Sequence, residues 1–315
     1  MRAQLTMATR ESRLALWQAH HVKQQLERQG HRVSLLGMTT LGDQILDQPL
    51  SQVGGKGLFI KELEVALAEG SAHLAVHSLK DVPMDLPPGF ELACILERED
   101  PRDAWVSPHC ARLDDLPPGA VVGTSSLRRT VLLKALRPDL RIEPLRGNLD
   151  TRLRKLDEGQ YAGIVLATAG LKRLGLQDRI RYAFPLDTMR PAAGQGAIGI
   201  EICADRPDLA EILASLNHLP TALQVYAERG VSRTMGGSCS MPLAAHATLT
   251  QHAMPQQTLT LHAAWGDPQT PNAPLIQAEG SCTLVLSAAD VLAQATALGQ
   301  RVAQQLIAHG ATAMG

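Results

Sequence analysis

Residues 74–83 read Leu74-Ala75-Val76-His77-Ser78-Leu79-Lys80-Asp81-Val82-Pro83, an apolar run that ends in a lysine, an aspartate and a proline. The apolar run predicts a short buried strand, and Pro83 stops it because proline has no N–H for the strand ladder. Ligands bind at the carboxyl ends of strands in open α/β sheets, so Lys80 and Asp81 are placed for chemistry. A solvated Lys-Asp pair at the start of a loop is the alternative reading of this stretch by itself.

The composition is that of an ordinary globular protein with an uneven distribution of arginine. The 315 residues are enough for two or three domains, and Lys plus Arg total 30 against 31 Asp plus Glu. No overall charge therefore attracts nucleic acid or a membrane. Only seven of the basic residues are Lys, and a single Arg follows Arg233. Because the guanidinium fork pairs with carboxylates and phosphates, the first two-thirds of the chain is predicted to bind a small polyanion.

The same sequence predicts a cytoplasmic protein. The N-terminus has no signal-peptide core, and no apolar run approaches the roughly 18 residues of a membrane span. The five cysteines are odd in number and include no Cys-x-x-Cys pair, which is typical of a reducing compartment. The histidines show no metal-ligand pattern, so we expect no metal. No apolar stripe demands a partner, and we expect a monomer.

Arginine and hydroxyl residues recur where a predicted strand passes into a helix. A helix N-terminus already favours an anion, so four such junctions indicate anion binding more strongly than any one of them. Arg128 and Arg129 lie in a first helical turn, where the helix dipole opposes them, a placement typical of ligand-binding residues. Gln18 is a polar position in an apolar helical stripe and fits either a core edge or the wall of a site. The four junctions are residues 9–12, 123–129, 145–148 and 170–173.

Three further stretches look like known motifs or linkers. Residues 97–103 are a charge run broken by Pro101, which predicts a linker or hinge. Residues 194–199 match G-x-G-x-x-G but lead into a predicted strand, which excludes dinucleotide binding and favours a second crossing back to the first sheet. The glycines of residues 54–57 lack the spacing of a phosphate-binding loop and predict a flap instead.

Cys239 differs from the other cysteines. It lies in Gly236-Gly237-Ser238-Cys239-Ser240-Met241-Pro242, which predicts a tight exposed loop. Such a thiol is a candidate nucleophile or attachment point. Cys94, Cys203 and Cys282 lie in apolar runs and fit the usual buried role. Strands at 243–248, 259–265 and 282–286 and a helix from 288 to about 309 complete a small α+β domain.

These stretches together resemble the porphobilinogen deaminase (hydroxymethylbilane synthase) family over nearly the whole chain. The resemblance rests on residues 8–12, 53–59, 77–83, 97–103, 122–129, 145–148, 169–174 and 191–196. It implies an α/β protein with two periplasmic-binding-protein-like domains forming a cleft, plus a smaller C-terminal α+β domain. The implied boundaries are 1–98 with 196–215 for domain 1, 99–195 for domain 2 and 219–315 for domain 3.

The resemblance also implies the chemistry. A transferase of this family joins four porphobilinogen molecules head to tail into hydroxymethylbilane, with loss of ammonia, in haem biosynthesis. A dipyrromethane cofactor would be attached to Cys239 through a thioether, and Asp81 would stabilise the azafulvenium cation and manage protons. Lys56 and Phe59 would belong to a flap. Side chains expected to bind the carboxylate arms of cofactor and substrate are Arg10, Ser12, Lys80, Ser126, Arg128, Arg129, Arg146, Arg152 and Arg173. Further expected contacts are Gln18, Thr124, Ser125, Gly147 and Gln195.

One departure and two alternatives accompany this interpretation. The family's cysteine loop most often reads Gly-Gly-Cys-Gln-Val-Pro, whereas Ser238 precedes the cysteine here. A two-domain solute-binding module for a polycarboxylate would explain the arginines but gives no use to Asp81 or Cys239. A thiol enzyme with Cys239 as nucleophile needs a nearby base, and His246 shows no orienting partner in the sequence.

Overall fold

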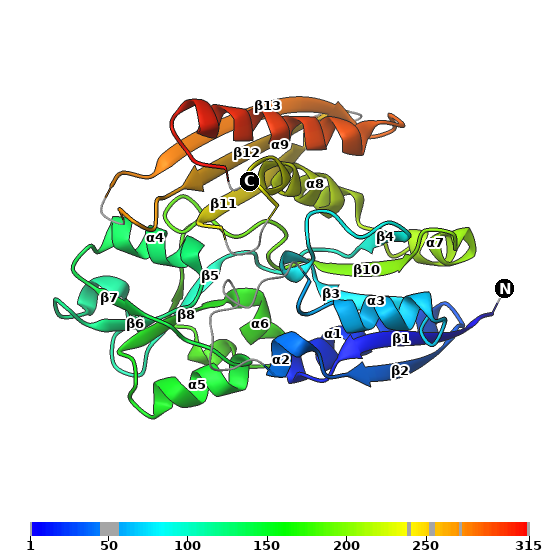
Figure 1. Cartoon of the computed structure of the whole chain (residues 1–315), viewed down its shortest axis with the longest axis horizontal. Helices are drawn as coiled ribbons and strands as arrows, with labels where there is room; N and C mark the ends of the chain where they lie inside the picture. The colour runs from blue at the N-terminus through cyan, green and yellow to red at the C-terminus, as the bar shows by residue number, and fades with distance from the viewer. Residues whose placement is uncertain (1, 45–56, 238–240, 252–255, 271–272, 314–315) are drawn as a thin grey trace. The chain divides into compact units, whose positions relative to one another are not determined.

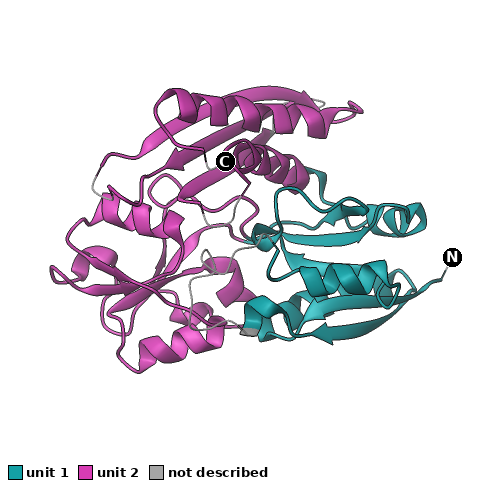
Figure 2. Ribbon diagram, in the orientation of Figure 1, with its two compact units in different colours: residues 1–99, 196–219 teal, residues 100–195, 220–315 magenta. Residues whose placement is uncertain are grey.

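The computed structural model describes residues 2–44, 57–237, 241–251, 256–270 and 273–313, and the chain divides into two compact units. Unit 1 contains Met1–Glu99 and Gly196–Leu219, and unit 2 contains Asp100–Gln195 and Pro220–Gly315 (Figure 2). The chain therefore passes between the units near residues 99 and 195, and again at the start of the last hundred residues. The division into three domains at the boundaries given above stays a prediction.

Unit 1 is built on a five-stranded sheet in the order β2-β1-β3-β10-β4 (Figure 1). β1 runs parallel to β2 and β3, whereas β10 runs antiparallel to both β3 and β4. Apolar side chains of α1 pack on this sheet at the spacing that the sequence predicts, and Gln18 is buried among them. The strands are β1 (Gln4–Arg10), β2 (Arg32–Met38), β3 (Leu74–Ser78), β4 (Phe90–Ile95) and β10 (Ile198–Cys203). The helices are α1 (Arg13–Arg28), α2 (Leu41–Gln44), α3 (Lys61–Ala68), the 3₁₀ turn η1 (Leu79–Asp81) and α7 (Pro207–Ala214).

Unit 2 contains a second five-stranded sheet with the order β7-β6-β8-β5-β9. β6 runs parallel to β7 and β8, whereas β5 runs antiparallel to β8 and β9. The strands are β5 (Asp103–Val106), β6 (Val121–Gly123), β7 (Arg141–Glu143), β8 (Gly163–Ala167) and β9 (Tyr182–Ala183). The helical segments are η2 (Leu113–Asp115), α4 (Leu127–Leu136), α5 (Leu149–Asp157), α6 (Thr168–Arg173) and η3 (Gln177–Arg179).

The C-terminal part of unit 2 is a smaller antiparallel sheet, β11-β12-β13, with α8 and α9 beside it (Figure 1). α8 and α9 approach closely at Gly230 and Gly299, where a Cβ on Gly299 would lie 2.1 Å from the Ala227 carbonyl oxygen. The elements are α8 (Leu219–Thr234), β11 (Leu243–Gln251), β12 (Gln256–Trp265), β13 (Ile276–Val285) and α9 (Val291–Ala308). The predicted strands and final helix are all present here.

The two larger sheets share one arrangement, which confirms the predicted fold class. In each, three parallel strands are followed across the sheet by an antiparallel strand, β10 or β5. β5 begins a few residues after the chain enters unit 2, and β10 begins directly after it returns to unit 1. The glycine-rich residues 194–199 thus lead into a strand of the first sheet, as predicted, and the dinucleotide interpretation stays excluded.

The core of unit 1 contains a cluster of ionisable side chains. His77 on β3 and Glu201 on β10 lie diagonally across the two strands, and His77 Nε2 is 2.8 Å from Glu201 Oε2. Both are buried, as is Glu64 of α3. Burial and the charge of Glu201 raise the pKa of Glu64, although His77 and Lys61 act in the opposite direction. Folding therefore makes the Glu64 carboxyl harder to ionise than it is in the unfolded chain.

This cluster predicts that Glu64→Gln stabilises the protein at neutral pH. Because folding raises the pKa of Glu64, its contribution to stability is full below the unfolded value of 4.5 and is lost as the pH rises through the folded value. Glutamine cannot ionise, so the variant should unfold roughly 2–4 °C higher than the parent at pH 7.5. The difference should vanish near pH 4. Thermal unfolding followed by circular dichroism at both pH values measures this, and Glu69→Gln, at the exposed end of α3, is the control.

Candidate functional site

In unit 1, Lys80 and Asp81 lie directly after β3, at the carboxyl end of the parallel strands. The chain turns there through η1, where Leu79 is buried and its N–H donates to the Ala197 carbonyl at 3.1 Å. Lys80 and Asp81 are half-buried. The buried Gln18 Nε2 donates to Ser78 Oγ at 2.8 Å, so this helix residue braces the strand end just before the turn.

Arg10 lies at the end of β1, next to the N-terminus of α1. Its Nε donates to Asp43 Oδ2 at 3.0 Å, and its guanidinium lies 4.3 Å from the centre of the Phe59 ring. Burial would raise the pKa of Asp43, but hydrogen bonds from Arg10 and Thr40 outweigh it and hold this pKa below its ordinary value. Ser12 caps α1 by accepting from the Ala15 N–H at 3.3 Å. Arg10 thus has a protein carboxylate as its partner in unit 1.

The loops after β6 and β7 of unit 2 are tied together by Ser125. Its hydroxyl donates to the Leu145 carbonyl at 2.9 Å and accepts from the Leu145 N–H at 3.0 Å. Ser126 caps α4, with its Oγ 3.4 Å from the Arg129 N–H, and the Thr124 hydroxyl accepts from the Ser126 N–H. These bonds hold the N-terminus of α4 beside the loop that carries Arg146.

Arg146, Gly147 and Arg152 belong to the segment that opens α5. Gly147 has φ +103°, a left-handed conformation that an L side chain rarely adopts, and its carbonyl accepts from Arg152 Nε at 2.8 Å. Arg146 and Arg152 are half-buried, as is Arg173 at the end of α6. Arg146 therefore lies between the parallel strand β7 and the start of α5, as predicted. Residues 170–173, in contrast, form the C-terminal part of α6, so the prediction of a strand-to-helix junction there is wrong.

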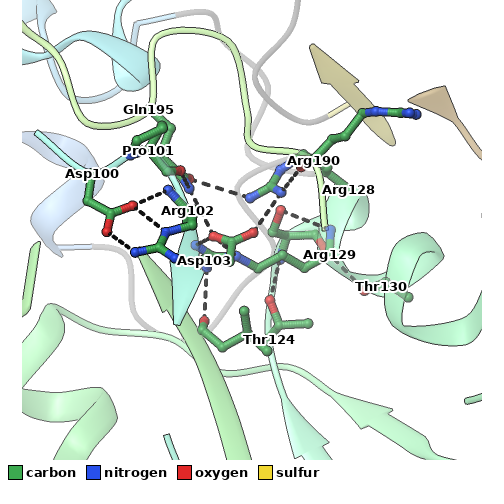
Figure 3. Close-up of polar contacts among 12 residues, drawn as sticks. Asp100, Pro101, Arg102, Asp103, Thr124, Arg128, Arg129, Thr130, Arg190 and Gln195 are labelled. Atoms are coloured by element: carbon green, nitrogen blue, oxygen red, sulfur yellow. Dashed lines mark hydrogen bonds and ion pairs between the residues drawn. The ribbon is translucent and has the colours of Figure 1, made fainter. Parts of the chain in front are cut away.

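Arg128 and Arg129 are buried against Asp103, the first residue of β5 (Figure 3). Arg128 Nη1 donates to Asp103 Oδ2 at 2.7 Å, and Arg129 Nη2 and Nε donate to Oδ1 at 2.7 and 3.1 Å. The Asp103 side chain is fully buried, and the arginine side chains are only 4% and 6% exposed. Burial would raise the pKa of Asp103, but the two arginine charges hold it far below its usual range.

Gln195, labelled in Figure 3, and three backbone carbonyls complete the cluster. Gln195 Nε2 donates to Asp103 Oδ1 at 3.0 Å and to the Pro101 carbonyl at 2.7 Å. Arg128 also donates to the Arg190 carbonyl and Arg129 to the Val165 carbonyl. Arg128 Nε is buried and has no hydrogen-bond partner among the described residues. The cluster therefore holds two cations against one anion.

Asp103 was missed as a site residue in the sequence. The charge run of residues 97–103 predicts a linker or hinge, and the chain does pass from unit 1 to unit 2 at residues 99 and 100. Asp103, at the end of this run, is nevertheless fully buried. The available signal is the apolar run Ala104-Trp105-Val106 that follows it, which is buried in β5. An acid as the first residue of a buried strand requires a partner in the fold.

His246 corrects another sequence expectation, because it does have a carboxylate beside it. His246 Nδ1 lies 3.2 Å from Glu228 Oε1, and both side chains are buried. Glu228 also accepts from the N–H groups of Gly194 and Ala247 at 2.8 and 2.9 Å. Glu228 therefore ties α8 to both β11 and the segment before β10.

Two predicted site residues, Cys239 and Lys56, lie outside the described residues. Within the described ranges, no group of His, Cys, Asp or Glu side chains is arranged to hold a metal ion. In the same ranges, none of the helices combines the length and apolar character needed to cross a membrane.

Comparison with known proteins identifies the family. Residues 5–211 match the porphobilinogen deaminase, dipyromethane cofactor binding domain, and residues 222–308 match the porphobilinogen deaminase C-terminal domain. The porphobilinogen deaminase of Albidiferax ferrireducens is 65% identical, across 98% of this chain and 96% of the relative. That of Ralstonia nicotianae is 59% identical, across 98% and 89%.

A solved structure of a nutrient binding protein from Burkholderia cenocepacia bound to methionine is also similar, with a TM-score of 0.41 and 16% identity over 68% of this chain and 90% of that one. The two domain matches and the curated relatives agree on one activity. The chain belongs to the porphobilinogen deaminase family, transferases that use a dipyrromethane cofactor to condense porphobilinogen into hydroxymethylbilane in tetrapyrrole biosynthesis.

Proposed function

We propose that Asp81 is the catalytic carboxylate of this deaminase and that the arginines at the strand ends bind the carboxylate arms of cofactor and substrate. The observation that carries the proposal is the Asp103 cluster, where two buried arginines face one protein carboxylate. A buried cation without its full complement of anions is costly, so the cluster suits a ligand carboxylate.

The residues present fit a dipyrromethane, which carries acetate and propionate arms. The buried Nε of Arg128 is a donor without a partner among the described residues, and a carboxylate is the acceptor it suits best. Further contacts are proposed from both units. Those of unit 1 are Arg10, Ser12, Gln18 and Lys80. Those of unit 2 are Thr124, Ser125, Ser126, Arg129, Arg146, Gly147, Arg152, Arg173 and Gln195. When bound, the dipyrromethane supplies the pyrrole carbon on which the tetrapyrrole is built.

Asp81 would act on the substrate's charge. Porphobilinogen that loses ammonia leaves a cationic methylene pyrrole, and a fixed carboxylate stabilises that cation more than it stabilises the uncharged pyrrole ring of the substrate. The Asp81 carboxyl group would donate its proton to the departing amine, and the carboxylate so formed would face the cation and later accept the proton that the pyrrole carbon loses as the new bond forms. Lys80 beside it adds a cation for a substrate carboxylate.

We further propose that Cys239 is the attachment point, that Lys56 and Phe59 belong to a flap, and that the protein is a cytoplasmic monomer without a metal. The described cysteines, Cys94, Cys110, Cys203 and Cys282, are free thiols, as suits a reducing compartment. The large apolar side chains exposed in the described residues are scattered over several elements, which supports a monomer.

The activity itself is tested by supplying the purified protein with porphobilinogen. We expect release of one ammonia for each porphobilinogen consumed, and a product that closes to uroporphyrin-type pigment. Binding of porphobilinogen without ammonia release would instead support a solute-binding module.

Asp81→Asn should leave a folded, cofactor-loaded protein whose kcat is lower by about 10³-fold, because the amide keeps the shape but removes the charge that stabilises the cation. Steady-state ammonia release and intact mass measure the two properties. Asp85→Asn, which neutralises an exposed acid in the same loop, is the control and should keep near-normal turnover. Near-normal turnover of Asp81→Asn would exclude Asp81 as the catalytic carboxylate.

Cys239→Ala should abolish a covalent mass increase in the isolated protein. The parent should exceed its sequence mass by one dipyrromethane after denaturation, because a thioether survives unfolding whereas a noncovalent pyrrole is lost. Cys94→Ala, Cys110→Ala, Cys203→Ala and Cys282→Ala should each keep the increase in intact-mass spectra. An unmodified parent that still makes tetrapyrrole would show that the loop containing Ser238 works differently.

A further inference from the structure

We propose that Asp103 is a positioning residue, which holds Arg128 and Arg129 in the arrangement that receives a ligand carboxylate. The inference rests on the proposed function, because it presumes that these arginines bind carboxylate arms of the cofactor or substrate. Asp103 itself would touch neither, since its side chain is fully buried and its oxygens already accept from protein donors.

The need for such a residue follows from where the arginines lie. Arg128 and Arg129 are the second and third residues of α4, where the partial positive charge of the helix N-terminus repels cations. Long arginine side chains at that place gain entropy and hydration by extending into water. Both are instead folded back onto β5 by bonds of 2.7 Å to one carboxylate. The Asp103 carboxylate thus offsets the repulsion between the two arginines and the helix N-terminus. It also restricts the rotamers of both arginine side chains, so a ligand does not have to order them when it binds.

The hydrogen bonds of the two arginines show which of them has the buried donor left over for the ligand. Arg129 uses Nε, Nη1 and Nη2 on Asp103 and the Val165 carbonyl. Arg128 bonds Asp103 only through Nη1, its Nη2 reaches Gln195 Oε1 at 3.4 Å, and its Nε is unpartnered among the described residues. Arg129 therefore fixes Asp103, and Asp103 fixes Arg128 in a position where its Nε–H is left without a partner among the described residues.

Gln195, at the end of the segment that leads back to β10, is also held in place by Asp103. Its amide group donates to Asp103 and to the Pro101 carbonyl, two residues before Asp103. One carboxylate thereby receives side chains from the start of α4 and from the residue that precedes Gly196, where the chain re-enters unit 1. A shift of Asp103 would displace all of these donors together.

The experiment measures cofactor loading in apoprotein rather than turnover alone. Apoprotein of the parent and of Asp103→Asn is incubated with increasing porphobilinogen, and the loaded fraction is read from intact mass. The amide cannot balance two arginines, so the half-saturating concentration should rise by about 10- to 100-fold, the effect of weakening a charge-assisted bond. Asp157→Asn, which breaks an exposed pair with Arg179 in the same unit, should load as the parent does.

Three further measurements separate positioning from a purely structural role. The near-UV circular dichroism of Asp103→Asn should match that of the parent at the loading temperature. Asp103→Ala leaves room for a small carboxylate, so formate, but not chloride at equal ionic strength, should restore part of its loading. Arg128→Leu should raise the half-saturating porphobilinogen concentration less in the Asp103→Asn variant than in the parent. The reason is that Asp103 acts on the ligand through the Arg128 guanidinium.

Parent-like loading of Asp103→Asn would overturn the inference, and so would a loading loss that tracks loss of tertiary structure without formate rescue. If the proposed function itself is wrong, the experiment gives a different result. If Arg128→Leu loads as the parent does, the assignment of that arginine to a ligand carboxylate is wrong, whatever Asp103 does.

Discussion

Each of the two larger sheets depends on a strand that joins it after the chain has changed units. In unit 1, β10 pairs with both β3 and β4, so the strand that delivers Lys80 and Asp81 has a second neighbour, opposite β1, only because the chain returns at Gly196. In unit 2, β5 pairs with β8 and β9 in the same way. β10 and β5 each also carry a buried acid, Glu201 and Asp103 respectively. The connection that completes a sheet therefore also places an acid in it.

The buried ion cluster around Asp103 is not expected to add much to the stability of the fold. Removing two guanidinium groups and a carboxylate from water costs several kcal/mol for each ion, and a well-packed apolar replacement is often as stable. The excess of positive charge around Asp103 makes the arrangement less favourable still. The proposed function gives such a cluster a role, because its arginines would already be desolvated and oriented before a ligand carboxylate arrived.

The structural features that could be predicted from the sequence are those that depend on residues close together in the chain. The strand before Pro83, the apolar stripe of α1 and the strand after the glycines of residues 194–199 follow from local patterns, and the structure confirms them. The partner of Asp103 could not be found in this way, because Arg128 and Arg129 lie 25 and 26 residues further along the chain. The same limit applies to the proximity of His77 and Glu201, which depends on the register of β3 and β10.

Two helices begin with the same serine cap, but the arginine beside each cap has a different electrostatic environment. Ser12 caps α1 and Ser126 caps α4, each after the strand at the equivalent place in its sheet. Arg10 precedes its cap and pairs with Asp43, where both side chains are about one-fifth exposed, at 22% and 23%. Water can replace either partner of such a pair at little cost, so the ligand carboxylate proposed for Arg10 would be able to take the place of Asp43. Arg128 follows its cap and pairs with the fully buried Asp103, which water cannot replace. If Arg128 binds a ligand carboxylate as proposed, that carboxylate must therefore add to the protein carboxylate, and the surplus positive charge of the cluster would favour the addition.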